Sequence, residues 1–163
     1  MATATQEYRV NAGFNDYIET IQALSIEFLT ELKEEFIAYL AANNRNATGK
    51  SSASLQVIPT DTGGQLVGGN WIYYTFTGRA PGQMPPISAI IDWLNARGLP
   101  RAMAWNVAKK IAREGTDLFQ QGGRNNNAFT EILTQERIDE FAKNISNLVA
   151  VEINSGIMEA WAA

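Results

Sequence analysis

The chain has 163 residues, of which 45% are hydrophobic and 18% are charged, and its formal net charge is −4. It contains no cysteine and no histidine, which excludes disulfides, thiolate nucleophiles, cysteine metal sites and the commonest proton shuttle. The negative charge opposes sequence-independent binding to phosphate backbones, and no apolar run approaches the roughly 20 residues of a membrane span. We therefore expect neither free nucleic acid nor a membrane as a partner, and one domain over residues 1–163.

The first periodic segment, residues 14–43, predicts a long amphipathic helix. Its apolar residues recur at steps of three and four, and glutamates occupy much of the remaining surface. Asp16 followed by Glu19 has the form of a capping box, and the stretch "NNRNATG" is typical of a helix end. Residues 1–13 are expected to form an N-terminal arm; they lack the basic and apolar stretches of a secretory signal, so we expect the chain to act where it is made or inside an assembly.

Residues 50–77 change to a period of two and predict a three-stranded antiparallel meander. The strands are expected at "SASLQVIPT", "QLVGG" and "NWIYYTFT", with a turn at "TDTGG". In the third strand, Trp71, Tyr73 and Thr75 would share one face, and Ile72, Tyr74 and Phe76 the other. Since both faces are largely apolar, we expect both to be covered, one of them by a neighbouring subunit or a later helix.

The remaining segments return to helical patterns. Residues 85–114 predict a pair of short helices, which begin after Pro85-Pro86 and have Gly98 and Gly115 as stops. The Gly- and Asn-rich stretch 115–130 is expected to be a surface loop, and 131–161 a second long helix. The predicted fold class is therefore α+β: two long helices packed on a small antiparallel meander, with a short helical pair inserted.

Two chemical alternatives follow from short motifs. The helical pair resembles a helix-turn-helix reader of DNA, and it carries the most basic cluster of the chain: Arg97, Arg101, Lys109, Lys110 and Arg113. The acidic balance of the chain opposes this alternative and favours contact of the cluster with an acidic protein surface or with DNA in a channel.

The second alternative, a Ser-Lys nucleophile at Lys50 with Ser51, Ser52 and Ser54, lacks any sign of an oxyanion hole. The carboxylates form no spaced pair or ligand set for Mg²⁺. We expect no enzyme activity, no catalytic residues, no metal site and no cofactor.

The loop "TGRAPGQMPP" (residues 77–86) is the strongest candidate for a binding surface. Its prolines restrict the backbone before any partner arrives. Arg79 offers a forked charge-assisted hydrogen bond and Met84 an adaptable apolar contact, and both residue types are enriched at protein interfaces. The alternative is a plain connector between two elements.

The order of these segments resembles the tail-completion or neck proteins of tailed bacteriophages, in the version carried by phages of Bacteroidota hosts. The resemblance covers residues 14 to 150 and is carried by Thr48-Gly49 with Ser54-Leu55, by Gly78-Arg79 with Pro81, and by "PPISAIIDWLNARGL…AWNVAKKIAREGT". It implies a non-catalytic structural virion protein that forms a homo-oligomeric ring at the head–tail junction or the top of the tail.

The implied partners are other virion proteins, namely the connector or portal-side ring and the tail tube, with at most indirect contact to DNA in the channel. The implied location is the virion, after assembly in the bacterial host cytoplasm. We predict that subunit contacts involve the aromatic segment, the proline-rich loop and the 115–127 loop, through Trp71, Tyr74, Phe76, Arg79, Met84 and Arg124.

Overall fold

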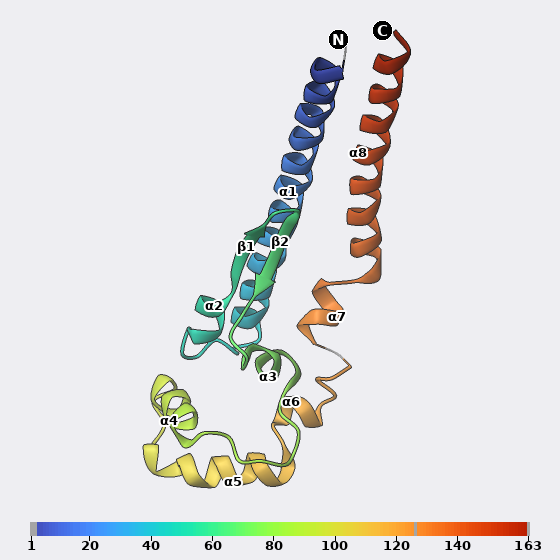
Figure 1. The fold of residues 1–163 in the computed structure, drawn as a ribbon. Coiled ribbons are helices and arrows are strands. Elements are labelled where there is room, and N and C mark those ends of the chain that lie inside the picture. Colours follow the sequence, from blue (N-terminus) through green and yellow to red (C-terminus); the bar gives the residue numbers. More distant parts are fainter. Residues whose placement is uncertain (1–2, 126, 163) are drawn as a thin grey trace. The chain divides into compact units, whose positions relative to one another are not determined.

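The computed structural model describes the backbone of residues 3–125 and 127–162, and the side chains of residues 17–125, 127–151, 153–155 and 158. The chain is 66% helical with one small two-stranded antiparallel sheet, in agreement with the predicted α+β class (Figure 1). It divides into two compact units: the first unit is residues 1–31, 57–66 and 134–163, and the second unit is residues 32–56 and 67–133. The expected single domain stays a prediction, because compactness alone does not show whether either unit folds without the other.

The first unit combines α1 (Thr3–Ala42, which continues into the second unit), α8 (Gln135–Ala162) and a hairpin of β1 (Gln56–Thr60) and β2 (Gly63–Val67). The hairpin lies against α1, where the Gln22 Nε2 donates to the Thr60 carbonyl oxygen (2.6 Å). Gly64 permits this approach, because a Cβ there would lie 3.0 Å from Leu29. On α8, the Phe141 ring stacks on Phe28 of α1 at 4.3 Å between centroids.

The second unit contains the end of α1 and seven further short elements: α2 (Lys50–Ser54), α3 (Ile72–Thr77), α4 (Ile87–Ala96), the 3₁₀ turn η1 (Arg101–Met103), α5 (Ala104–Glu114), α6 (Asp117–Gln120) and α7 (Ala128–Ile132). Its centre is an aromatic cluster in which Phe76 meets Phe36 (5.1 Å), Phe129 (5.1 Å) and Tyr39 (6.3 Å). The apolar stripe of α1 therefore enters the core through Phe36 and its neighbours, as its periodicity predicts.

The expected third strand is wrong, since "WIYYTFT" contains the helix α3. Alternating aromatic and β-branched residues favour a strand locally, but Ile72 and Phe76 stand four residues apart and share the inward face of a helix. Burial of the Phe76 ring in the aromatic cluster outweighs the local preference, because six residues have little helix or strand stability of their own. The sheet therefore has two strands, and residues 71–76 do not present the two opposite strand faces that were expected to be covered.

Several element bounds also differ from the sequence predictions. Helix α1 begins at Thr3, so Asp16 lies inside it and cannot cap it; residues 3–13 are helical, and the rest of the expected arm lies outside the described residues. The expected loop 115–130 contains α6 and part of α7, and α8 begins at Gln135. The helical pair within 85–114 is confirmed.

Candidate interaction surface

The loop 77–86 is held in one shape by hydrogen bonds from its backbone to the last turn of α5 and to Thr116, just after that helix. The Arg79 N–H donates to Thr116 Oγ1 (2.9 Å), and the Thr116 N–H donates back to the Arg79 carbonyl oxygen (2.9 Å). Further along, the Gly82 N–H donates to the Ala112 carbonyl oxygen (2.8 Å). Cross-links to residues 112–116 therefore order the loop in addition to its prolines, of which Pro85 is buried.

Two glycines make this close approach possible. Gly78 (φ 78°, ψ 166°) and Gly115 (φ 80°, ψ −175°) occupy a backbone region that is essentially restricted to glycine. A Cβ on Gly78 would collide with the backbone nitrogen of Phe119 and lie 2.8 Å from Thr116 Oγ1, and one on Gly115 would lie 2.7 Å from the Arg79 carbonyl oxygen. The glycines thus define the contact between the loop and the 112–119 segment.

Arg79 is half-buried, and its side chain contacts its own loop and the neighbouring helix α3. Its Nη2 donates to the Gln83 carbonyl oxygen (2.9 Å), and its guanidinium lies over the Tyr74 ring, 5.4 Å from the centroid. These contacts orient the guanidinium and leave part of it accessible to a partner. The side chain joins the loop to the surface of α3.

Large side chains gather on α3 and the loop. We define the α3 patch as five residues: Trp71, Tyr73, Tyr74, Arg79 and Met84. Tyr73 and Tyr74 are 52% and 49% exposed and meet edge to face, while Trp71 is 47% and Met84 39% exposed. Tyr73 was not among the predicted interface residues; a helix that buries Phe76 leaves both tyrosines exposed.

Two other predicted interface residues have different surroundings. Phe76 is only 1% exposed, so its ring packs inside the folded chain and offers no surface to a partner. Arg124 is exposed, and its guanidinium lies 5.0 Å from the Phe119 ring centroid. The neighbouring Asn127 is 3% exposed and caps α7, so the 115–130 segment is anchored at this point.

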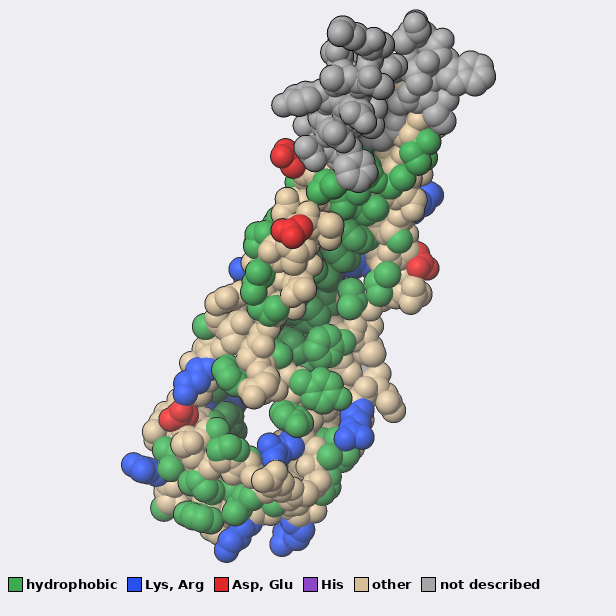
Figure 2. Space-filling view, viewed as in Figure 1, with side chains coloured by type: hydrophobic (Ala, Val, Ile, Leu, Met, Phe, Trp, Pro, Cys, Tyr) green, Lys and Arg blue, Asp and Glu red, His purple; other side chains and the backbone are tan. Residues whose placement is uncertain are grey.

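A second exposed surface is formed by α4, η1 and α5, residues 87–114, which we call the basic arm. It carries five Lys and Arg residues against Asp92 and Glu114, a net charge of +3. Figure 2 shows blue side chains gathered over these elements. Interspersed with them are four exposed apolar side chains that the sequence analysis did not select: Trp93, Leu99, Met103 and Trp105.

The arm is attached to the rest of the second unit by polar contacts. Lys50 Nζ pairs with Asp92 Oδ2 at 2.6 Å, and the Arg97 Nη2 donates to the Asn44 carbonyl oxygen at 2.6 Å. The Arg97 guanidinium also lies 5.3 Å from the Trp93 ring centroid. Lys50 is therefore engaged with a carboxylate.

The serines beside Lys50 bond to nearby groups. The hydroxyls of Ser52 and Ser54 donate to the carbonyl oxygens of Gly49 (3.0 Å) and Ser51 (2.9 Å). This is the pattern of serines that stabilise a short helix.

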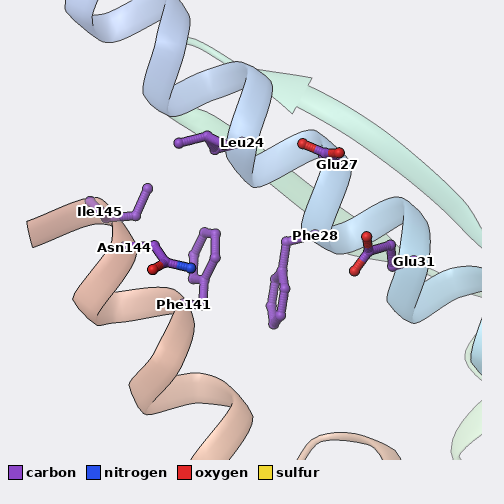
Figure 3. Close-up of a pocket in the computed structure, with 7 residues that line it drawn as sticks. All are labelled: Leu24, Glu27, Phe28, Glu31, Phe141, Asn144 and Ile145. Atoms are coloured by element: carbon purple, nitrogen blue, oxygen red, sulfur yellow. The ribbon is translucent and has the colours of Figure 1, made fainter. Parts of the chain in front are cut away.

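The first unit presents a groove between α1 and α8 with both apolar and polar lining residues (Figure 3). It is lined by Leu24 and Phe28 from α1 and by Phe141 and Ile145 from α8, with the two phenyl rings facing each other between the helices. Polar lining residues, Glu27, Glu31 and Asn144, complete it. The Arg137 Nη2 lies 3.7 Å from the Glu31 carboxylate.

The described part of the chain contains neither a metal-binding cluster nor a membrane-spanning helix. Among the described side chains, those of residues 17–125, 127–151, 153–155 and 158, no group of three or more Asp and Glu is arranged to hold a metal ion. None of the helices described has the length and apolar character of a membrane-spanning segment. In comparisons with known proteins, no family model, curated protein or solved structure matches this chain.

Proposed function

We propose that the chain is a structural virion protein, a subunit of a ring at the head–tail junction or the top of the tail of a tailed bacteriophage. The observation that carries the proposal is the α3 patch: exposed Trp and Tyr side chains at α3, next to Met84 and the half-buried Arg79 on a loop whose backbone is already ordered. These residue types are the ones enriched at protein interfaces. A preformed loop also loses little conformational entropy when a partner binds.

In this proposal, α1 and α8 are the two long helices that support the hairpin and place the ring contacts. Virion proteins above and below the ring, the connector or portal-side ring and the tail tube, are the partners of the α3 patch. The chain has no catalytic role and holds no cofactor. It assembles in the bacterial host cytoplasm and touches DNA at most indirectly, where DNA passes through the channel.

The location of the protein tests the proposal directly. Particles released by the strain that carries the gene are purified and labelled with gold-conjugated antibody against the chain, and antibody depleted with the pure protein serves as the control. Label at the head–tail junction supports the proposal. Absence of the protein from purified particles by mass spectrometry refutes it.

A variant pair tests the role of the α3 patch. Particles are produced in a host that supplies either the double variant Trp71→Ala and Met84→Ala or the control Ile58→Ala, which removes a side chain exposed to a similar extent (43%) outside the patch. We expect incorporation of the double variant to fall at least about tenfold, as expected when two interface anchors are truncated, and that of the control to stay unchanged. Equal incorporation would remove the patch from the proposal.

A second candidate, a helix-turn-helix DNA-binding regulator, is favoured by the exposed cations of the basic arm. Against it, the connection from Arg97 to Met103 contains a 3₁₀ turn and is longer than the about three or four residues usual in that motif. Binding to duplex DNA that weakens steeply with salt would favour the regulator. Absence of DNA binding at low salt would exclude it.

A further inference from the structure

The described part of the first unit has no apolar core of its own. The buried hydrophobic side chains of the structure all lie in the second unit, and they are Leu32, Phe36, Leu40, Leu55, Phe76, Leu94, Ala104, Ala108 and Ala128. In the first unit, the apolar residues that line the groove between α1 and α8 are only partly buried, and the polar lining residues Glu27, Glu31 and Asn144 are exposed. Elsewhere on α8, Ile138, Val151 and Ile153 are 38%, 66% and 57% exposed. Such a surface is stabilised when another apolar surface covers it.

Charge separates between the two units and limits what can cover this surface. The first unit contains eleven Asp and Glu against three Lys and Arg, a net charge of −8, whereas the second contains six against ten, a net charge of +4. Pairing the first units of two copies would bring two such negative surfaces together, which is unfavourable. A covering surface should therefore be both apolar and basic.

The basic arm of another copy has both properties. On α5, Trp105 is 56% exposed, and Lys109, one helical turn further along, is also exposed. Residues four apart share a helix face, so an indole and an ammonium group project from the same side of the arm. The groove offers a complementary group for each of them: the Phe28 and Phe141 rings for the indole, and the carboxylate of Glu27 for the ammonium group.

We propose that α5 of one copy docks into the α1–α8 groove of the next copy. Trp105 covers the Phe28 and Phe141 rings, and Lys109 faces Glu27. The two surfaces are different and lie on every subunit, so the contact is head-to-tail and can close into a ring. The inference rests on the proposed function in that it supplies the subunit contact of the proposed ring.

Complementary single-surface variants test this contact. The arm variant, Trp105→Ala with Lys109→Ala, keeps an intact groove, and the groove variant, Glu27→Lys, keeps an intact arm. Sedimentation velocity over a concentration series measures self-association, and circular dichroism confirms that each variant remains helical. Lys33→Glu, a charge reversal on α1 outside both surfaces, is the matched control.

We expect wild type and Lys33→Glu to self-associate, and the arm variant and the groove variant each to associate at least about tenfold more weakly. A mixture of the arm and groove variants retains one intact pair of surfaces and should stop at a dimer, with twice the 17.9 kDa mass of the chain. An isologous dimer, or variants that associate like wild type, would overturn the inference. A wild-type chain that stays monomeric up to about 1 mM would also overturn it, whereas the proposed function is judged separately by labelling of particles.

Discussion

Replacement of Phe76 by alanine distinguishes a core residue from an interface residue. The ring is 1% exposed and has three aromatic neighbours: Phe36 and Phe129, each at 5.1 Å, and Tyr39 at 6.3 Å. Removal of a buried phenyl ring loses its transfer free energy and leaves a cavity, which together cost about 3–5 kcal/mol. Since α1, α3 and α7 all contribute rings to this cluster, they cannot easily collapse into the space, and we expect a loss within that range.

Tyr74→Ala is the control, because it removes a ring of similar size from the same helix. That ring is 49% exposed, so its removal loses only about half of the hydrophobic free energy of a buried ring. We expect the free energy of unfolding to fall by about 1 kcal/mol. Urea unfolding followed by tryptophan fluorescence measures both variants, since Trp71, Trp93 and Trp105 all lie in the second unit. If Phe76→Ala lowers the free energy of unfolding no more than Tyr74→Ala does, the assignment of Phe76 to the core is refuted.

The other predictions concern the contacts that join the 77–86 loop to Thr116, and the N-cap of α7. Gly78→Ala should lower the free energy of unfolding by clearly more than about 1 kcal/mol, because its Cβ collides with backbone; Gly49→Ala, also at positive φ (69°) but with open space, measures the backbone cost alone in the same urea titration. Thr116→Val leaves the Arg79 N–H without its 2.9 Å acceptor and should cost about 1–3 kcal/mol, with faster amide hydrogen exchange at residue 79 as the specific readout. Asn127→Ala removes the side chain that accepts from the Phe129 N–H (2.9 Å), and we expect a loss of about 1 kcal/mol by thermal unfolding; an unchanged melting temperature would contradict the capping role.

Local sequence features were sufficient for the elements whose signals act over a few residues. The spacing of apolar residues predicted α1 and α8, because one face of a long helix must be apolar wherever it packs. Pro86 immediately before α4 and the positive-φ glycines Gly98 and Gly115 near the ends of α4 and α5 agree with the predicted bounds, since these residues act through their own backbone. The start of α1 was placed too late, because the capping-box pattern at Asp16 also occurs inside helices.

The candidate surface was predicted only in part. Arg79 and Met84 follow from the loop composition, and both are accessible in the structure. The contacts of the loop to Thr116 and Ala112 could not be predicted, because they join residues that are 37 and 30 positions apart in the sequence. The exposure of Trp105 could not be predicted either, because it depends on which face of α5 packs against α4.

By itself, the sequence determined the α+β class, the ends of α4 and α5, the lack of thiol and imidazole chemistry, and the total charge. Tertiary structure decided the conformation of residues 72–77, because the burial of Phe76 against rings from α1 and α7 exceeds the local preference for a strand. It also decided where the charge lies. The first unit is assembled from three separate segments, so its net charge of −8, set against +4 on the second unit, exists only once those segments fold together.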